Sequence, residues 1–173
     1  MIRRHVILVG LPGAGKTTVG RLVAAALGAE FVDLDEAIER RAGKSVPRIF
    51  AEDGEAAFRS LEADVGGAVL RSPPAVVAPG GGFFAGERMR ELATSSGLVV
   101  YLETDPKEAV RRLGGTAGRP LLEGGDPEQK MALLLAARGA LYDESECTVG
   151  TTGVSADAVA GAVVSLARDR AGW

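Results

Sequence analysis

The stretch Gly10-Leu11-Pro12-Gly13-Ala14-Gly15-Lys16-Thr17 matches the phosphate-binding pattern G-x-x-x-x-G-K-[ST] at every fixed position. The apolar run at residues 6–9 comes directly before it and predicts a buried strand. Apolar residues at helical spacing follow between residues 19 and 27 and predict a helix. Because this pattern binds phosphates between a strand and a helix, we interpret the stretch as a P-loop rather than a glycine-rich turn without a ligand.

The P-loop predicts binding of a nucleoside triphosphate through its backbone and two side chains. Glycines let the chain turn tightly, so successive N–H groups point at phosphate oxygens, and the positive end of the helix dipole adds attraction. Lys16 is expected at the β- and γ-phosphates, and the Thr17 hydroxyl is expected to bind Mg²⁺. The predicted ligands are therefore ATP and Mg²⁺, held by Gly13, Ala14, Gly15, Lys16, Thr17 and Thr18.

Outward from the P-loop, short apolar runs alternate with segments of helical spacing. We expect strands at residues 6–9, 31–34, 75–78 and 98–102, with a weaker fifth at 147–149. We expect helices over 36–42 and 46–52, along 58–69, and after Asp105, Asp126 and Ser155. This alternation predicts an α/β fold with a parallel sheet, in one domain over residues 1–173, and ligands at the carboxyl ends of the strands.

Composition narrows the functional classes. Apolar residues make up 46% of the 173 residues and charged residues 25%, and the net charge of −3 argues against a general nucleic-acid binder. There is no run of 18 apolar residues, so we expect no membrane span. Cys147 is the only cysteine, which excludes an internal disulfide and fits a reducing cytosol. We expect a cytoplasmic monomer with no nucleic-acid or membrane partner.

Two aspartates lie at the end of the second predicted strand. Asp33 and Asp35 are spaced i, i+2, so both carboxylates face one cleft if the extended conformation persists to Asp35. Phosphoryl transfer needs a carboxylate that orders Mg²⁺ and a group that orients and deprotonates the attacking hydroxyl, and such a pair could supply both. The alternative is that Asp35 caps the following helix.

Further charged and glycine-rich positions could face the acceptor. Arg59 and Glu62 are neighbours at i, i+3 on a predicted helix, where the alternative is a surface ion pair. Arg138 is in register with the apolar face of its helix, so it either snorkels or lines a cleft. The three glycines at 80–82 follow a strand and favour close approach of the backbone to a ligand, with a tight turn as the alternative.

Residues 114–126 form a glycine-rich loop around the core Arg119-Pro120-Leu121-Leu122. Flexible glycine flanks around a positive charge are typical of a closing lid. The alternative is a disordered surface loop.

Taken in order along the chain, these motifs resemble the shikimate kinase family of small P-loop kinases. The resemblance runs from about residue 6 to about residue 143. It rests on residues 10–17, Val32-Asp33-Leu34-Asp35, Phe58-Arg59-Ser60-Leu61-Glu62, residues 80–82, Arg119-Pro120-Leu121-Leu122 and Arg138-Gly139-Ala140-Leu141-Tyr142. It implies a P-loop NTPase-type three-layer fold with a five-stranded parallel sheet flanked by helices, an acceptor-binding subdomain at about 35–62, and a mobile lid at about 114–126.

The resemblance implies an enzyme that transfers the γ-phosphoryl group of ATP to a ring hydroxyl of shikimate, in the shikimate pathway of aromatic amino acid biosynthesis. On the nucleotide side it implies that Lys16 and Thr17 serve the phosphates and Mg²⁺, and that Asp33 helps to hold Mg²⁺ through water. It also implies that Arg119 on the lid contacts the ATP phosphates and that Arg112 stacks near adenine.

On the acceptor side the resemblance implies that Asp35 binds ring hydroxyls and orients or deprotonates the attacking one. Arg59 and Arg138 would clamp the shikimate carboxylate, with Glu62 ordering Arg59. Gly81 and Gly82 would line the acceptor pocket. The implied catalytic residues are Lys16, Asp35 and Arg119.

Three details depart from the family pattern: Pro47 lies in a short helix, Phe83-Phe84 follow the triple glycine, and the lid is unusually rich in glycine. They imply a slightly different pocket wall and a more mobile lid. Two other functions stay open on sequence alone. One is a P-loop kinase for another small hydroxylated acceptor, and the other is a nucleotide-binding regulatory protein without turnover. His5 and Cys147 belong to no motif and are assigned no role.

Overall fold

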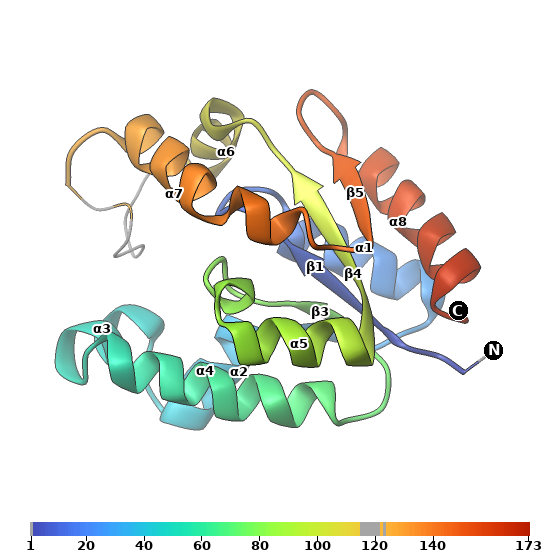
Figure 1. The fold of residues 1–173 in the computed structure, drawn as a ribbon, viewed down its shortest axis with the longest axis horizontal. Coiled ribbons are helices and arrows are strands. Elements are labelled where there is room, and N and C mark those ends of the chain that lie inside the picture. The colour runs from blue at the N-terminus through green and yellow to red at the C-terminus, as the bar shows by residue number, and fades with distance from the viewer. Residues whose placement is uncertain (1, 115–121, 123) are drawn as a thin grey trace.

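The computed structural model describes residues 2–114, 122 and 124–173, and five parallel strands form its centre. The strands are β1 (His5–Val9), β2 (Phe31–Asp33), β3 (Val76–Ala78), β4 (Gly97–Glu103) and β5 (Cys147–Gly150). Their order across the sheet is β2-β3-β1-β4-β5 (Figure 1). The predicted α/β fold is confirmed, and so is the weak fifth strand, which pairs with β4.

The central strand β1 separates two apolar cores. Every residue of β1 is buried, because strands pair on both of its edges and helices cover both of its faces. Alternation along the strand sends Ile7 and Val9 to one core and Val6 and Leu8 to the other. The result is the predicted three-layer arrangement, with the sheet between two layers of helices.

Two helices cover one face of the sheet and the remaining helices cover the other. Val19 and Val23 of α1 (Lys16–Leu27) pack with Val159 and Val163 of α8 (Ala156–Arg170) in one core. The other core includes residues of α2 (Leu34–Ala42), α3 (Val46–Glu52), α4 (Glu55–Leu70), η1 (Phe83–Ala85), α5 (Glu87–Ser96), α6 (Pro106–Leu113) and α7 (Pro127–Tyr142). The helices α2, α3 and α4 lie together at the β2 side of the molecule (Figure 1).

Helix ends follow local signals in the sequence. Asp105, Asp126 and Ser155 each accept a backbone N–H at the start of α6, α7 and α8, as their positions predict. Gly28 ends α1 in the left-handed conformation. Ser45 occupies the N-cap position of α3, but its side chain makes no capping bond. The Glu39 carboxylate instead accepts the Val46 N–H at 2.9 Å.

The helix α5 and the short η1 turn were not predicted from the sequence. Both lie between the triple glycine and β4, where Met89 and Ala93 bury one face of α5. Within the described ranges, no helix is both long and apolar enough to cross a membrane.

Candidate active site

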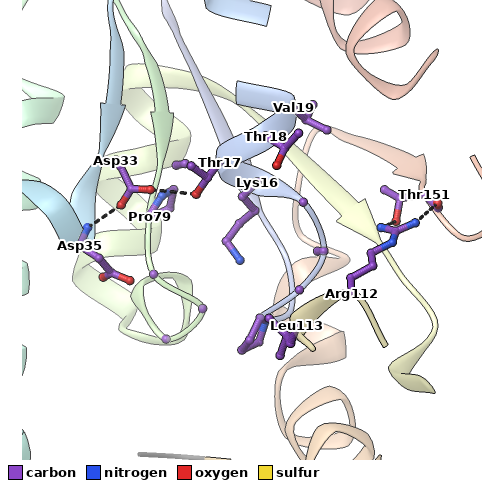
Figure 2. A pocket seen from close by; sticks show the side chains of 18 of the residues that line it. Lys16, Thr17, Thr18, Val19, Asp33, Asp35, Pro79, Arg112, Leu113 and Thr151 are labelled. Carbon is purple, nitrogen blue, oxygen red and sulfur yellow. Dashed lines mark hydrogen bonds between the residues drawn. The ribbon is translucent and has the colours of Figure 1, made fainter. Parts of the chain in front are cut away.

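A cleft of about 780 Å³ opens at the carboxyl ends of the central strands. The P-loop forms one wall and the turn after β3 lies opposite it (Figure 2). Residues of α2, α3 and α4 also line the cleft. The predicted site residues that line it are Gly13, Ala14, Gly15, Lys16, Thr17, Thr18, Asp33, Asp35, Arg59, Gly81, Gly82 and Arg112.

The P-loop has the backbone that its glycines permit. Gly13 and Gly15 have φ values of 81° and 94°, which side-chain-bearing residues rarely adopt. A Cβ at Gly13 would also collide with the Ala109 carbonyl of α6. The Lys16 ammonium donates to the carbonyls of Gly10 at 3.0 Å and Leu11 at 2.9 Å, and Figure 2 shows its side chain extending beside the loop. The loop therefore presents a positive charge beside the N-terminus of α1.

Thr17 and Asp33 form the candidate metal position. The Thr17 hydroxyl donates to Asp33 Oδ2 at 2.8 Å, so two hard oxygen donors lie next to the P-loop (Figure 2). This donor set fits Mg²⁺, which takes oxygen ligands and keeps several waters. Among the described residues no group of three or more His, Cys, Asp or Glu side chains could form an all-protein metal cage. Thr17 and Asp33 therefore fit a metal ion that would take further ligands from a bound phosphate.

Asp33 and Asp35 both line the cleft, but the structure corrects the backbone geometry expected for the pair. The strand β2 ends at Asp33 and α2 begins at Leu34, so the extended conformation does not reach Asp35. Asp35 is not the cap either. Asp33 Oδ1 accepts the backbone N–H of Asp35 at 3.1 Å and of Glu36 at 3.3 Å, which makes Asp33 the N-cap. Because the Asp33 carboxylate accepts N–H groups of the first helical turn, the helix starts directly after Asp33 and the strand ends there.

Asp35 still reaches the cleft, from the first turn of α2 rather than from the strand. Figure 2 shows its carboxylate turned toward the loop after β3. A Cβ at Gly80 would lie 2.9 Å from Asp35 Oδ1, so a larger residue there would push the carboxylate aside. The carboxylate and the P-loop therefore lie on the same cleft, as a phosphoryl acceptor site requires.

Arg59 and Glu62 form an ion pair that lines the cleft. Arg59 Nη1 donates to Glu62 Oε2 at 2.7 Å, and Glu62 is only 4% exposed. Burial raises the pKa of the Glu62 carboxyl, and the Arg59 guanidinium opposes part of that rise. Glu62 Oε1 is buried and has no hydrogen-bond partner among the described residues. The surface-pair alternative is therefore wrong, because this pair is partly desolvated and faces a cavity.

The triple glycine lets these side chains approach the backbone. A Cβ at Gly82 would lie 2.6 Å from Arg59 Nη1, and the φ values of Gly80, Gly81 and Gly82 are not positive. Space, rather than unusual backbone conformation, therefore explains the glycines. Arg138 is not among the residues that line the cleft. It donates to the Gly81 carbonyl at 2.7 Å.

Arg112 is held firmly at the other end of the cleft. Its Nε donates to Glu108 at 2.9 Å, and its two other nitrogens donate to the Thr151 hydroxyl at 3.0 Å and carbonyl at 2.6 Å (Figure 2). Hydrogen bonds from Arg111 and Arg112 lower the pKa of Glu108 to about 2, so this carboxylate stays charged. A fixed, planar guanidinium in a cleft is suited to contact a flat ring.

Sequence reasoning missed part of the lining. Thr151, Gly153, Val154 and Ser155 follow β5 and line the end of the cleft near Arg112. Their place after a predicted strand was the available signal, because ligands bind at the carboxyl ends of parallel strands. An apolar wall was also missed. It consists of Val46, Phe50, Phe58 and Leu122.

The departures from the family pattern have local explanations. Phe83 and Phe84 do not line the pocket, so they do not alter its wall. Both are buried in the core, where Phe83 packs against Gly66 and Phe84 stacks with Tyr142. Pro47 lies in the first turn of α3, where its missing N–H costs nothing. Arg119 and most of the predicted lid lie outside the described residues.

Known proteins that resemble this chain identify its family. The family model described as shikimate kinase matches residues 12–168. A shikimate kinase from Rhodococcus erythropolis is 42% identical over 95% of this chain and 97% of its own length. One from Thermobifida fusca is 48% identical over 84% of both chains. A solved shikimate kinase from Acinetobacter baumannii in complex with shikimate superimposes with a TM-score of 0.93, at 39% identity over 96% of this chain and 94% of that one. The chain belongs to the shikimate kinase family.

Proposed function

We propose that this chain transfers the γ-phosphoryl group of ATP to a ring hydroxyl of shikimate, giving shikimate 3-phosphate and ADP. The observation that carries the proposal is that the P-loop lysine, the Asp35 carboxylate and the Arg59 guanidinium line one cleft. The first group serves a phosphate, the second a hydroxyl and the third a carboxylate. Shikimate is a small acid that bears ring hydroxyls, so it matches the acceptor half.

The nucleotide half would bind ATP at three places. The backbone of residues 13–18 and the N-terminus of α1 would hold the phosphates, with Lys16 neutralising their charge. Arg112, fixed by Glu108 and Thr151, would lie against the adenine. Arg119 would complete the phosphate contacts from the lid, and Arg119→Ala is expected to lower kcat much more than it weakens shikimate binding.

The acceptor half would bind shikimate through charge and hydrogen bonds. Arg59 would bind the carboxylate from the cleft wall, with Glu62 holding it in place. Arg138, which donates one N–H to the Gly81 carbonyl, would complete the clamp with its remaining N–H groups. Asp35 would accept hydrogen bonds from ring hydroxyls. Glu62 Oε1, buried and without a partner among the described residues, could accept another. The rings of Phe50 and Phe58, whose centroids lie 4.7 Å apart, would exclude water from one side of the acceptor.

The chemical step follows from these positions. The acceptor hydroxyl gives its proton to the Asp35 carboxylate while its oxygen attacks the γ-phosphorus. The bond from the γ-phosphorus to the oxygen bridging it to the β-phosphate breaks, and ADP leaves with those electrons. Lys16 would stabilise the charge that develops on the phosphate oxygens.

Thr17 and Asp33 would hold Mg²⁺, Thr17 directly and Asp33 through water. When bound, the metal would offset negative charge on the β- and γ-phosphates. We further propose one kinase domain over residues 1–173, acting as a monomer in the cytoplasm, with an acceptor-binding subdomain at about 35–62 and a lid at about 114–126.

A coupled assay of ADP release tests the function. We expect release that depends on both shikimate and Mg²⁺, and no comparable release with gluconate or nucleoside monophosphates. Lys16→Ala is expected to abolish useful turnover without changing the melting curve, because it removes charge and not packing. Turnover that prefers another acceptor would contradict the assignment of shikimate. ATP binding without transfer to any acceptor would contradict an enzymatic role altogether.

A further inference from the structure

The carbonyl oxygen of Gly81 accepts hydrogen bonds from two side chains of α7. Arg138 Nη1 donates to it at 2.7 Å, and the Tyr142 hydroxyl donates to it at 2.9 Å. Gly81 itself lies on the cleft wall beside the P-loop. A Cβ there would come 3.2 Å from Pro12 Cδ and 3.5 Å from Arg138 Nη1. One backbone carbonyl therefore fixes the position of Arg138 relative to the phosphate-binding loop.

Tyr142 is the better fixed of the two donors. It is the last residue of α7, is 1% exposed, and stacks on Tyr101 with ring centroids 4.9 Å apart and an interplanar angle of 21°. Phe84 stacks nearby at 6.5 Å. Burial raises the pKa of the Tyr142 hydroxyl, so it stays protonated and able to donate. The aromatic stack therefore holds one donor rigidly on Gly81.

Arg138 is long and flexible, and its charge lies close to the acceptor half. That charge opposes part of the rise in the pKa of Glu62, whose carboxylate lines the cleft. A guanidinium has five N–H groups in one plane. One N–H group held on Gly81 restricts the directions in which the remaining N–H groups can point. Positioning of the Gly81 carbonyl thus decides where Arg138 presents its other donors.

We propose that Tyr142 is a positioning residue for acceptor recognition. By sharing the Gly81 carbonyl with Arg138, it sets the direction in which the guanidinium meets the carboxylate of the acceptor. This inference rests on the proposed function and adds a residue that does not line the cleft.

The test compares Tyr142→Phe with Tyr101→Phe. Both variants lose one hydroxyl from a buried, stacked ring. Of these two hydroxyl groups, only that of Tyr142 donates to the Gly81 carbonyl. The readout is the ratio of kcat/KM for shikimate to kcat/KM for its methyl ester, which lacks the carboxylate charge. We expect Tyr142→Phe to lower this ratio about two- to tenfold, with the KM for ATP unchanged, and Tyr101→Phe to leave the ratio unchanged. A general packing defect would reduce turnover of both acceptors alike.

A double-mutant cycle shows whether the effect passes through Arg138. In an Arg138→Lys background, where the planar fork is absent, Tyr142→Phe is expected to have no further effect on the ratio. An undiminished effect there, or equal ratios for Tyr142→Phe and Tyr101→Phe, would overturn the proposal. A wild-type chain without shikimate-dependent ADP release would instead overturn the proposed function, so the two failures are distinguishable.

A second measurement does not require Tyr142→Phe to fold. The chain has two tyrosines, so a Tyr101→Phe chain grown on fluorotyrosine carries one label, at Tyr142. We expect the fluorine resonance to shift when shikimate binds and to shift less with the methyl ester. A resonance that is unchanged at saturating shikimate would overturn the role of Tyr142.

Discussion

At the scale of single residues, two aspartates that are close in sequence have different roles because the backbone changes conformation between them. Asp33 ends β2, caps α2 and accepts from Thr17. Asp35 lies one step into the helix and reaches the other side of the cleft, next to Gly80. Asp33 is thereby suited to the metal side and Asp35 to the acceptor hydroxyl.

Asp35→Asn is expected to nearly abolish phosphoryl transfer while sparing ATP binding. Asparagine keeps the shape of the side chain and loses the charge that accepts the proton. The measurements are kcat with shikimate and the Kd for ATP. Glu36→Gln is the matched control, since Glu36 is the next residue, is exposed, and pairs with Arg21 away from the cleft. An intact kcat in Asp35→Asn would refute the role as base, and lost ATP affinity would indicate a role in metal binding.

Arg59→Lys is expected to weaken shikimate binding although the charge is kept. Lysine cannot form a planar two-point contact with a carboxylate, and the expected loss is on the order of 1.5–3 kcal/mol. Binding of shikimate and of its methyl ester is to be measured by titration. The control is Arg48→Lys on α3, where an exposed arginine pairs with Glu52 outside the cleft. Equal discrimination against the ester by wild type and Arg59→Lys would show that Arg59 does not read the carboxylate.

At the scale of elements, charged side chains of α2, α4 and α7 all lie against the turn after β3. Gly80 borders Asp35, Gly81 borders Arg138, and Gly82 borders Arg59. The three helices come from separate segments of the chain, and residues 80–82 have no side chains that would obstruct them.

Gly82→Ala is expected to raise the KM for shikimate several-fold with little change in Tm. The new Cβ would lie 2.6 Å from Arg59 Nη1, and the far end of a flexible arginine can move aside without disturbing the core. Gly86→Ala is the control in the same loop, because its Cβ would meet its nearest neighbour, the Phe83 carbonyl oxygen, at an ordinary 3.7 Å. If both variants keep the wild-type KM, Arg59 does not need this position for binding.

At the scale of the whole molecule, a buried histidine lies at the end of the sheet opposite to the cleft. The cleft lies at the carboxyl ends of the strands, whereas His5 begins β1 and is 3% exposed. His5 Nδ1 accepts the Ala75 N–H at 3.1 Å, just before β3, and an acceptor nitrogen must be unprotonated. Burial lowers the pKa of His5, and backbone groups around it oppose part of that shift.

The folded chain is expected to lose stability as the pH falls below the ordinary histidine value of about 6.5. The pKa of His5 is lowered on folding, so the unfolded chain takes up the proton first, and the stabilisation is complete only above that value. The slope from this one group is at most about 1.4 kcal/mol per pH unit. His5 is the only histidine, so its NMR titration is unambiguous. A midpoint at or above the ordinary value would contradict the prediction.

His5→Asn provides the matched variant for this pH dependence, because its amide oxygen can still accept the Ala75 N–H but does not titrate. Its Tm is expected to fall less than that of wild type between about pH 7.5 and about pH 5.5. Since His5 lies away from the cleft, kcat at neutral pH is expected to be the same in both chains.

The sequence by itself determined the features whose physics is local. The P-loop follows from its glycines, its lysine and its position between a strand and a helix. The strands follow from short apolar runs, and the starts of α6, α7 and α8 follow from capping residues, because a cap acts within three residues of itself. The family motifs were enough to assign the candidate site residues to particular strands, helices and turns.

Only the tertiary structure decided how those residues meet. The sequence could not show that β2 stops at Asp33, because the same residues are compatible with an extended strand and with a helix cap. It could not show that Arg138 donates to the carbonyl of Gly81, 57 positions away, or that Phe83 and Phe84 belong to the core and not to the pocket. Contacts of this kind depend on which helix faces the turn after β3. That is decided by packing of the whole core, where many distant apolar side chains must fill one volume together.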